Sequence, residues 1–153
     1  EKRIILKHLN LKAYQQLLFT SMRYGETRSL DGDSHHAVTP KTAILCVTGI
    51  AQPAPYVEHL KQMTDQIDHI AFPDHHNYSD TDIKRIIQEY EKINITDKCI
   101  FTTEKDAVRL TLCNIPEEIR RQIFYIPIEP EFLTPRDQLI KNIYDYVRQD
   151  TRK

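Results

Sequence analysis

Glycine is scarce in this sequence, with three glycines among 153 residues. That scarcity argues against a glycine-rich phosphate loop, and the pattern G-x-x-x-x-G-K-S/T occurs nowhere. The formal net charge is −1, which excludes the strong positive field that attracts nucleic acid. The sequence has no long apolar run and no signal-peptide pattern, so we expect no membrane-spanning segment and a soluble chain.

Cysteine is also sparse. Cys46, Cys99 and Cys113 are the three cysteines, an odd number with no C-x-x-C pair. The first two fall inside predicted strands, so we expect buried, reduced thiols that suit a reducing cytosol. A metal or redox role is the weaker alternative.

The length allows one globular domain with a core, or one domain plus an appendage. The first residue is Glu1 rather than methionine, which suggests a fragment of a longer protein. Proteolytic processing, or a deliberately chosen first residue, would also explain the missing methionine. Residues 2–11 are expected to form a short helix and residues 14–22 a strand.

Residues 24–40 are polar and rich in turn-forming residues, with a strong turn signal at Asp31-Gly32-Asp33-Ser34. We therefore place a domain boundary in this stretch, as a hairpin or an ordered linker. The adjacent His35 and His36 are interpreted as solvated loop residues, because neighbouring histidines alone do not make a metal site.

After Pro40 the sequence alternates between strand and helix patterns. Four apolar runs predict buried strands at residues 43–48, 67–72, 98–102 and 123–128. Pro127 in the last run suggests an edge or strand-end position. Repeated strand–helix units predict a mostly parallel sheet flanked by helices, a Rossmann-like three-layer α/β/α fold.

Four helices are expected between and after these strands. Core-facing positions identify three of them: Tyr56, Val57, Leu60 and Met63; Ile83, Ile86, Ile87 and Tyr90; and a last stripe of Ile140, Ile143 and Val147. Ser79-x-x-Asp82 resembles a capping box, and Thr134 with Pro135 predicts the start of the last helix. Residues 105–112 are expected to form a short helix.

Asp74, His75 and His76 follow the second strand, at its carboxyl end, where open α/β sheets build their sites. His75 could act there as a general base or proton relay, and Asp74 could fix the tautomer of its ring. The alternative is a loop that only prepares the following helix. The residues alone leave the two interpretations evenly matched, and His76 and Asn77 are expected to be structural or solvent-facing.

Two further groups follow strand ends. Lys105 could bind phosphate while Glu104 and Asp106 orient it or a hydroxyl, but Thr103 as an N-cap with acids in the first turn is the favoured alternative. Gly49 permits an unusual backbone angle or close approach of a ligand, although an ordinary strand–helix turn is favoured there.

Taken in order, these motifs resemble a known family. The stretches that carry the resemblance are residues 14–17, 24–25, 47–53, 71–78, 102–109 and 124–128. They are similar to the C-terminal half of tetraacyldisaccharide 4'-kinase, the lipid A 4'-kinase of Gram-negative bacteria. The similarity covers most of the chain, and three ordered motifs at similar spacing make it specific.

The resemblance implies a P-loop kinase of two α/β domains that uses ATP and Mg²⁺. Such an enzyme transfers the γ-phosphate of ATP to the 4'-hydroxyl of tetraacyldisaccharide 1-phosphate, a glucosamine lipid, at the cytoplasmic face of the inner membrane. Residues 1–24 would then end the N-terminal kinase domain, residues 25–40 would form the linker or hairpin, and residues 41–153 the C-terminal α/β domain.

The resemblance also implies roles for single residues. His75 would face the interdomain cleft and assist the attacking hydroxyl, with Asp74 supporting it and an aspartate of the first domain as its partner. Glu104, Lys105 and Asp106 match the family's Thr-Glu-Lys-Asp motif, and they would either contact substrate or hold the cleft wall.

The Walker A loop, the Mg²⁺ ligands and the membrane-binding segment would belong to the other half, so we expect this chain alone to be inactive as a kinase. Two alternatives stay open. Asp-His-His also marks a manganese-dependent phosphoesterase class, for which Asp65 and Asp68 are candidate further ligands. The other alternative is a non-catalytic domain that binds a nucleotide or a protein partner.

Overall fold

The computed structural model describes residues 8–9, 11–12, 15, 17–133 and 136–150. The chain forms two compact units, one of Tyr24–Ile128 and one of Glu1–Arg23 with Glu129–Lys153. The domains predicted at 1–24, 25–40 and 41–153 concern a longer protein and stay a prediction.

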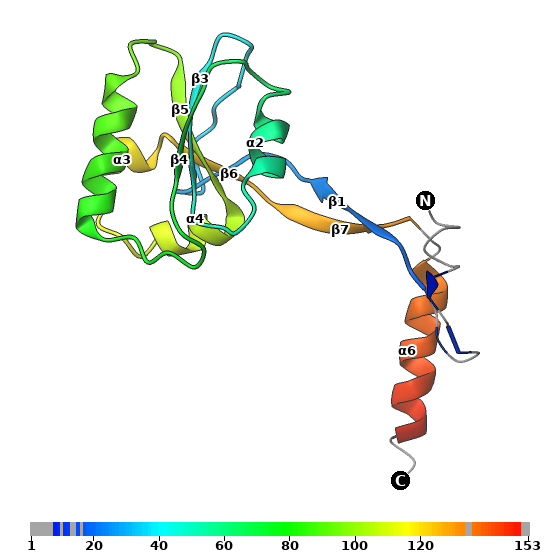
Figure 1. The fold of residues 1–153 in the computed structure, drawn as a ribbon. Helices are drawn as coiled ribbons and strands as arrows, with labels where there is room; N and C mark the ends of the chain where they lie inside the picture. The colour runs from blue at the N-terminus through cyan, green and yellow to red at the C-terminus, as the bar shows by residue number, and fades with distance from the viewer. Residues whose placement is uncertain (1–7, 10, 13–14, 16, 134–135, 151–153) are drawn as a thin grey trace. The chain divides into compact units, whose positions relative to one another are not determined.

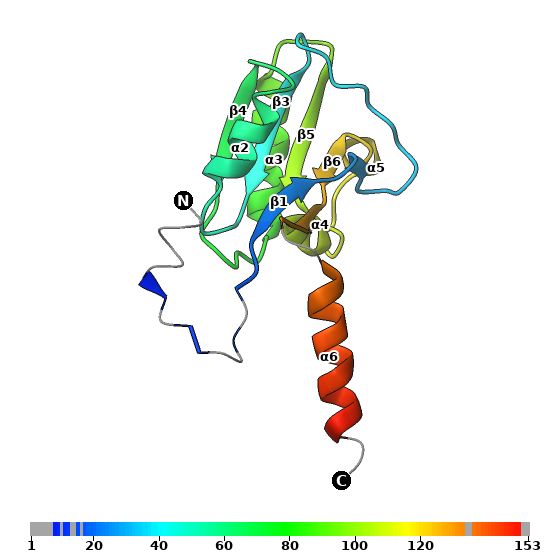
Figure 2. The same ribbon diagram turned by 90° about the vertical axis from the view of Figure 1, so that its right-hand side faces the viewer.

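The larger unit contains a five-stranded sheet. Its strands are β2 (Arg28–Ser29), β3 (Ala43–Thr48), β4 (Ile67–Ala71), β5 (Lys98–Thr103) and β6 (Ile123–Ile126), in the spatial order β2-β6-β5-β3-β4. Strands β3 to β6 run parallel, and β2 adds to β6 in the antiparallel direction. Figure 2 shows the sheet broadside, with β4 at one edge. The predicted mostly parallel sheet is confirmed.

Helices cover both faces of this sheet (Figure 1). They are α2 (Ala54–Leu60), α3 (Asp80–Lys92), α4 (Glu104–Leu110) and the short α5 (Glu117–Arg120). Strand β3 is buried along its whole length because its alternate side chains serve two cores. Leu45 and Val47 pack with α3 and α4, whereas Ile44 and Cys46 pack with α2. The three-layer α/β/α architecture is therefore confirmed.

Local sequence signals explain how the helices begin. Ser79 and Asp82 form the predicted capping box at the start of α3. Ile83, Ile86 and Tyr90 are buried on the inner face of α3. Ile87 packs against the same core while partly exposed. The cysteine prediction also holds in the sheet, where Cys46 and Cys99 are buried free thiols.

Part of the segment before β3 belongs to the sheet, because Arg28 and Ser29 form β2 and pair with β6. Leu30 is buried, and the carboxylate of Asp31 accepts hydrogen bonds from the backbone of Asp33 and Ser34, which confirms the predicted turn. His35 is exposed as expected. The interpretation of His36 as a solvated residue is wrong, because its Nε2 lies 2.9 Å from an Asp97 carboxylate oxygen and its ring packs on Phe124.

The smaller unit contains the helix α6 (Arg136–Asp150) and most of the paired strands β1 (Thr20–Tyr24) and β7 (Ile128–Phe132), of which Tyr24 and Ile128 belong to the larger unit. The strand predicted at 14–22 is wrong in extent, since among the described residues it begins at Thr20 and continues to Tyr24. The run at 123–128 is interrupted at Pro127, which ends β6 as predicted because proline has no N–H to donate to the ladder.

The buried stripe predicted for α6 is wrong. Ile140, Ile143 and Val147 are 37%, 54% and 52% exposed. The described part of this unit consists of two strands and one helix, which is too little structure to cover an apolar helix face. The predicted start of this helix at Thr134 and most of the helix predicted at 2–11 lie outside the described residues. No helix in the described part is long and apolar enough to cross a membrane.

Candidate active site

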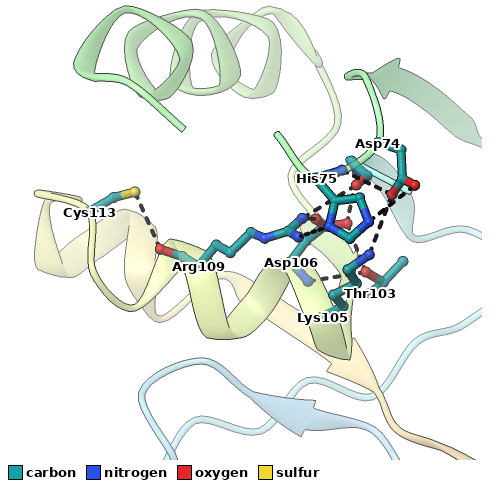
Figure 3. A network of polar contacts seen from close by, with 8 residues as sticks. Asp74, His75, Thr103, Lys105, Asp106, Arg109 and Cys113 are labelled. Carbon is teal, nitrogen blue, oxygen red and sulfur yellow. Dashed lines mark hydrogen bonds and ion pairs between the residues drawn. The ribbon is translucent and has the colours of Figure 1, made fainter. Parts of the chain in front are cut away.

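Three loops meet where the parallel strands end. Thr48 of β3 pairs in register with Ala71 of β4, and Val47 pairs with Thr102 of β5, so these strands finish at one edge of the sheet. Gly49 follows β3, the Asp74-His75 pair follows β4, and α4 begins directly after β5. The turn at Gly49 therefore meets most of the side chains singled out from the sequence, and Figure 3 shows the polar contacts of Asp74, His75, Thr103, Lys105 and Asp106.

Asp106 is the central residue of this cluster and is completely buried. Its Oδ2 accepts hydrogen bonds from the Gly49 N–H at 2.8 Å and from the Thr103 hydroxyl at 2.7 Å. Its Oδ1 accepts one from Nη1 of Arg109 at 3.1 Å. A buried carboxylate is tolerated only when it is paired and hydrogen-bonded, and Asp106 meets both conditions. It thereby ties the turn after β3 to the first turn of α4.

Thr103 has the N-cap role predicted for it. Its hydroxyl accepts a hydrogen bond from the Asp106 N–H at 3.2 Å, which satisfies one of the free N–H groups at the start of α4. The same hydroxyl donates to the Asp106 carboxylate. The capping interpretation and the site interpretation therefore describe the same atoms.

Gly49 is needed for space. A Cβ at this position would lie 3.0 Å from Asp106 Oδ1, 3.1 Å from the Tyr78 hydroxyl and 3.3 Å from Cβ of His76. Its φ lies outside the left-handed range, so an unusual backbone angle is not the reason for glycine. The close approach expected here is made by neighbouring side chains.

His75 stands on a constrained backbone. It is the one non-glycine residue of the described chain with a positive φ, at 58°. Such a conformation is unfavourable for residues with a Cβ and is often found where a site fixes a side chain. The His75 N–H donates to Asp74 Oδ1 at 2.9 Å, and the ring Nε2 lies 3.5 Å from Asp74 Oδ2.

Asp74 also accepts from Lys105, whose Nζ lies 3.4 Å from Oδ1. Desolvation raises the pKa of Asp74, but the hydrogen bonds from Lys105 and the His75 N–H, with the charges of both side chains, outweigh it and leave the pKa below its usual value. Asp74 is therefore an anion at neutral pH. The His75 side chain is 74% exposed, so the ring is accessible beside that anion.

The neighbouring aromatic residues are structural. His76 stacks on Phe72 and its Nε2 lies 3.0 Å from an oxygen of Asp82, as expected for a structural histidine. Asn77 is exposed. The Tyr78 hydroxyl is buried near Asp106, and burial, followed by the Asp106 charge, raises the pKa of this phenol far above its ordinary value. Tyr78 therefore stays neutral.

Comparison with known proteins identifies the family that shares this fold and these motifs. A family model described as tetraacyldisaccharide-1-P 4'-kinase matches residues 4–148. The chain belongs to the tetraacyldisaccharide 4'-kinase family. The resemblance carried by the motifs at residues 47–53, 71–78 and 102–109 is thereby confirmed.

Curated members of the tetraacyldisaccharide 4'-kinase family are similar along nearly the whole chain. The protein of that name from Bacteroides thetaiotaomicron is 42% identical over 162 residues, covering 97% of this chain and 43% of the relative. The one from Flavobacterium johnsoniae is 33% identical, covering 93% of this chain and 39% of the relative. This chain thus spans about two fifths of the length of the curated relatives it matches.

A solved structure supports the fold independently. LpxK from Aquifex aeolicus, crystallised in complex with ATP, superposes with a TM-score of 0.55 at 14% sequence identity. The match covers 92% of this chain and 39% of the Aquifex chain. At this identity the likeness bears on the fold alone, and it agrees with the α/β architecture.

The four residues of the Thr-Glu-Lys-Asp stretch, Thr103 to Asp106, do not all lie in the same part of the site. Thr103, Lys105 and Asp106 join the polar network, whereas Glu104 takes no part in it among the described contacts. Glu104 instead lines an open pocket of about 330 Å³ between α4 and β2, together with Val108 and Tyr125. The sequence grouped these four residues because they are consecutive, but a helix directs neighbouring side chains to different sides.

Arg109 is the site residue that the sequence analysis did not single out. It follows Asp106 by three residues on α4, so the two side chains share one face of the helix. That spacing is a usable signal. Its reach to Gly49 and His75, which come from other loops, could not be read from the sequence.

Among the described residues, no three His, Cys, Asp or Glu side chains gather to hold a metal ion. Asp74 and Asp106 are paired with Lys105 and Arg109. Asp68 lies within β4, three residues before its end, in a pocket with Arg85 and Glu89 of α3. The kinase family assignment and this arrangement both argue against the Asp-His-His phosphoesterase alternative.

Proposed function

We propose that the longer protein containing this chain phosphorylates a lipid. It transfers the γ-phosphate of ATP to the 4'-hydroxyl of tetraacyldisaccharide 1-phosphate, a tetraacylated glucosamine disaccharide, in lipid A biosynthesis. Family membership supports this proposal, as do the names of the relatives and the ATP complex of the Aquifex protein. In this proposal the chain supplies the cleft wall that carries Asp74 and His75.

The observation that carries the assignment of the site is the setting of His75. Its exposed ring stands on a left-handed backbone, beside the anionic Asp74, at the carboxyl edge of a parallel sheet. Phosphoryl transfer depends on positioning and charge, and the attacking hydroxyl must also be oriented and lose its proton. We assign His75 to assist that hydroxyl and Asp74 to orient and stabilise the imidazole.

The other residues hold this arrangement. Gly49, Thr103 and Asp106 fix the turns from which the site is built, and Lys105 holds Asp74 or contacts a phosphate. Glu104 lines the neighbouring pocket, where it contacts substrate or supports the cleft wall.

ATP and Mg²⁺ are assigned to the part of the longer protein outside this chain. The sequence has no Walker A pattern, and the described residues gather no group of three metal-ligating side chains. When bound, Mg²⁺ would neutralise charge on the transferring phosphoryl group. We further assign the working enzyme to the cytoplasmic face of the inner membrane, where it meets its lipid substrate through a membrane-binding segment beyond this chain.

The test is phosphorylation of the lipid substrate by the full-length protein. We expect an active wild type and a loss of about 10²-fold or more in kcat for His75→Ala, since a general base typically contributes that much. Melting curves should show both proteins folded. His35→Ala, which removes an exposed histidine outside the site, is the matched control and should keep full activity.

The same assay should detect no kinase activity in the 153-residue chain alone. An inactive full-length wild type would overturn the kinase proposal. Full activity in a folded His75→Ala variant would leave the kinase in place but remove His75 from its mechanism, in line with a scaffold role for this domain.

A further inference from the structure

Arg109 links the buried and the exposed parts of the site. Its side chain is 21% exposed, whereas that of Asp106 is fully buried and that of His75 is 74% exposed. Nη1 donates to Asp106 Oδ1 at 3.1 Å and lies 3.4 Å from the Gly49 carbonyl oxygen. Nη2 lies 3.5 Å from Nδ1 of His75. Figure 3 shows the guanidinium beside both side chains, with dashed lines for its contacts.

The planar shape of the guanidinium lets the contact with Asp106 control the contact with His75. Its nitrogen atoms form a rigid planar fork, so a fixed Nη1 also fixes where Nη2 points. Asp106 is held in turn by the Gly49 N–H and the Thr103 hydroxyl. The position of Nη2 beside the imidazole is thus determined by the contacts of buried Asp106.

The contact also selects a form of the imidazole. A guanidinium has only donors, so the ring nitrogen that faces it must offer a lone pair. The neutral ring then carries its proton on Nε2, which faces the anionic Asp74 at 3.5 Å. Both contacts are long, as hydrogen bonds at catalytic groups often are before substrate binds.

We propose that Arg109 is a positioning residue for His75: held by Asp106, it orients the imidazole and keeps Nδ1 unprotonated, so that Nδ1 is the atom that accepts the proton of the attacking hydroxyl when substrate takes the place of the long contact with Nη2. This inference rests on the function proposed above for the full-length protein. Arg109 contacts His75 and not the reacting atoms, so all of its effect on catalysis passes through that ring.

The competing explanation is that Arg109 only neutralises buried Asp106. A lysine at position 109 separates the two explanations, because one ammonium group can stay with Asp106 but has no second, rigidly placed donor for His75. If neutralisation is the whole role, Arg109→Lys should be nearly as active as wild type. If Arg109 positions His75, the variant should be stable and slow.

The experiment is a double-mutant cycle on the full-length kinase, with wild type, Arg109→Lys, His75→Ala and the double variant. We expect Arg109→Lys to lower kcat by about 10- to 100-fold, the size of effect caused by small misplacements, with KM nearly unchanged and a melting temperature close to wild type. In the His75→Ala background the same change should cause no further loss. Wild-type kcat in Arg109→Lys, or losses that multiply in the double variant, would overturn the inference.

A spectroscopic measurement on the wild-type protein covers the case in which a lysine at position 109 disturbs folding. In ¹⁵N-histidine spectra at a pH where the ring is neutral, the His75 signals are identified by their loss in His75→Ala. We expect Nδ1 to resonate as an unprotonated nitrogen and Nε2 as a protonated one. A proton on Nδ1 would overturn the inference.

The two proposals fail in different ways. An inactive wild type overturns the lipid kinase function and the role of Arg109 with it. An active wild type, a slow His75→Ala and multiplying losses in the double variant overturn the role of Arg109 alone. The tautomer of His75 is read without any kinase assay, so it tests the contact with Arg109 separately.

Discussion

Single residues of the core set the geometry of the exposed site. Asp106 receives hydrogen bonds from the turn after β3 and from both ends of the Thr103–Arg109 segment, and it is shielded from water. Removing a partner of a buried charge costs more than the pair contributes, because the remaining charge stays desolvated. The arrangement around His75 is therefore sensitive to changes that never touch the exposed ring.

Gly49→Ala tests this dependence. The added Cβ would lie 3.0 Å from Asp106 Oδ1 and 3.1 Å from the Tyr78 hydroxyl, and Asp106 cannot move without breaking its hydrogen bonds. We expect a loss of about 1–3 kcal/mol in the free energy of unfolding, typical of overpacking, together with reduced kcat in the full-length protein. Urea denaturation and the lipid phosphorylation assay measure the two effects.

Ala51→Ser is the matched control, because it adds one atom at an exposed position of the same turn. It should change stability by no more than about 0.5 kcal/mol and leave kcat unaltered. A Gly49→Ala variant as stable and active as wild type would show that the turn can open, and would contradict the tight packing around Asp106.

Some of these residue roles could be predicted from the sequence and some could not. The Asp74-His75 pair was found because proline ends an apolar strand just before it, which places both residues at the sheet edge. The capping role of Thr103 follows from local rules for helix starts. The burial of Asp106 depends on contacts with Gly49, 57 positions away in sequence, and no local pattern carries that information.

At the scale of elements, α3 offers the clearest link between a short motif and stability. The Ser79 hydroxyl and N–H both donate to Asp82, while the Asp82 N–H donates back to the Ser79 hydroxyl. The two hydrogen bonds from Ser79 lower the pKa of Asp82 to about 2, against a smaller opposing effect of desolvation and with added help from His76. The ionised form of Asp82 therefore stabilises the folded state.

Asp82→Asn should lower the free energy of unfolding by about 1 kcal/mol at neutral pH, the usual size of a cap. Because the pKa of Asp82 is depressed in the folded state, its contribution is complete above its ordinary value of 3.8 and is lost as pH falls through about 2. The gap between wild type and variant should thus shrink between about pH 4 and 2. Urea denaturation at several pH values measures it.

Asp80→Asn is the control for this experiment, since Asp80 is an acid in the same first turn but lies outside the capping box. Its effect should be smaller, limited to the interaction of one exposed charge with the helix dipole. Equal losses for the two variants, or a gap for Asp82→Asn that stays constant down to pH 2, would contradict the capping argument.

A helix or strand could be predicted where its own residues carry a pattern long enough to detect. Strands β3 and β5 were predicted because a strand buried on both faces carries a continuous apolar run, here Ala43–Val47 and Cys99–Phe101. Two-residue β2 and four-residue α5 were missed, since such short elements have no period to detect. The stripe on α6 has the period of a buried helix, yet Ile143 is 54% exposed. Periodicity indicates that a face is apolar and does not say which surface covers it.

At the scale of the whole molecule, the unit of Tyr24–Ile128 resembles an inserted domain, because the residues before it and the residues after it belong to the same second unit. Its two ends lie together, because the Gly25 N–H donates to the Pro127 carbonyl oxygen at 2.8 Å. The strands in which it begins and ends, β1 and β7, pair with each other. Domains whose ends meet in this way often fold without the rest of their chain.

Residues 24–128 on their own are therefore expected to fold cooperatively, with both cores of the sheet intact. Thermal melting by circular dichroism should show one transition. The matched control is residues 24–120, which lack β6; this strand lies between β2 and β5, so its loss exposes Phe101 and Ile100 and should leave the fragment unfolded. An unfolded 24–128 fragment would contradict the argument. Because Asp74, His75, Asp106 and Arg109 all lie inside this unit, its folding would separate the formation of the site from the chemistry that needs the rest of the kinase.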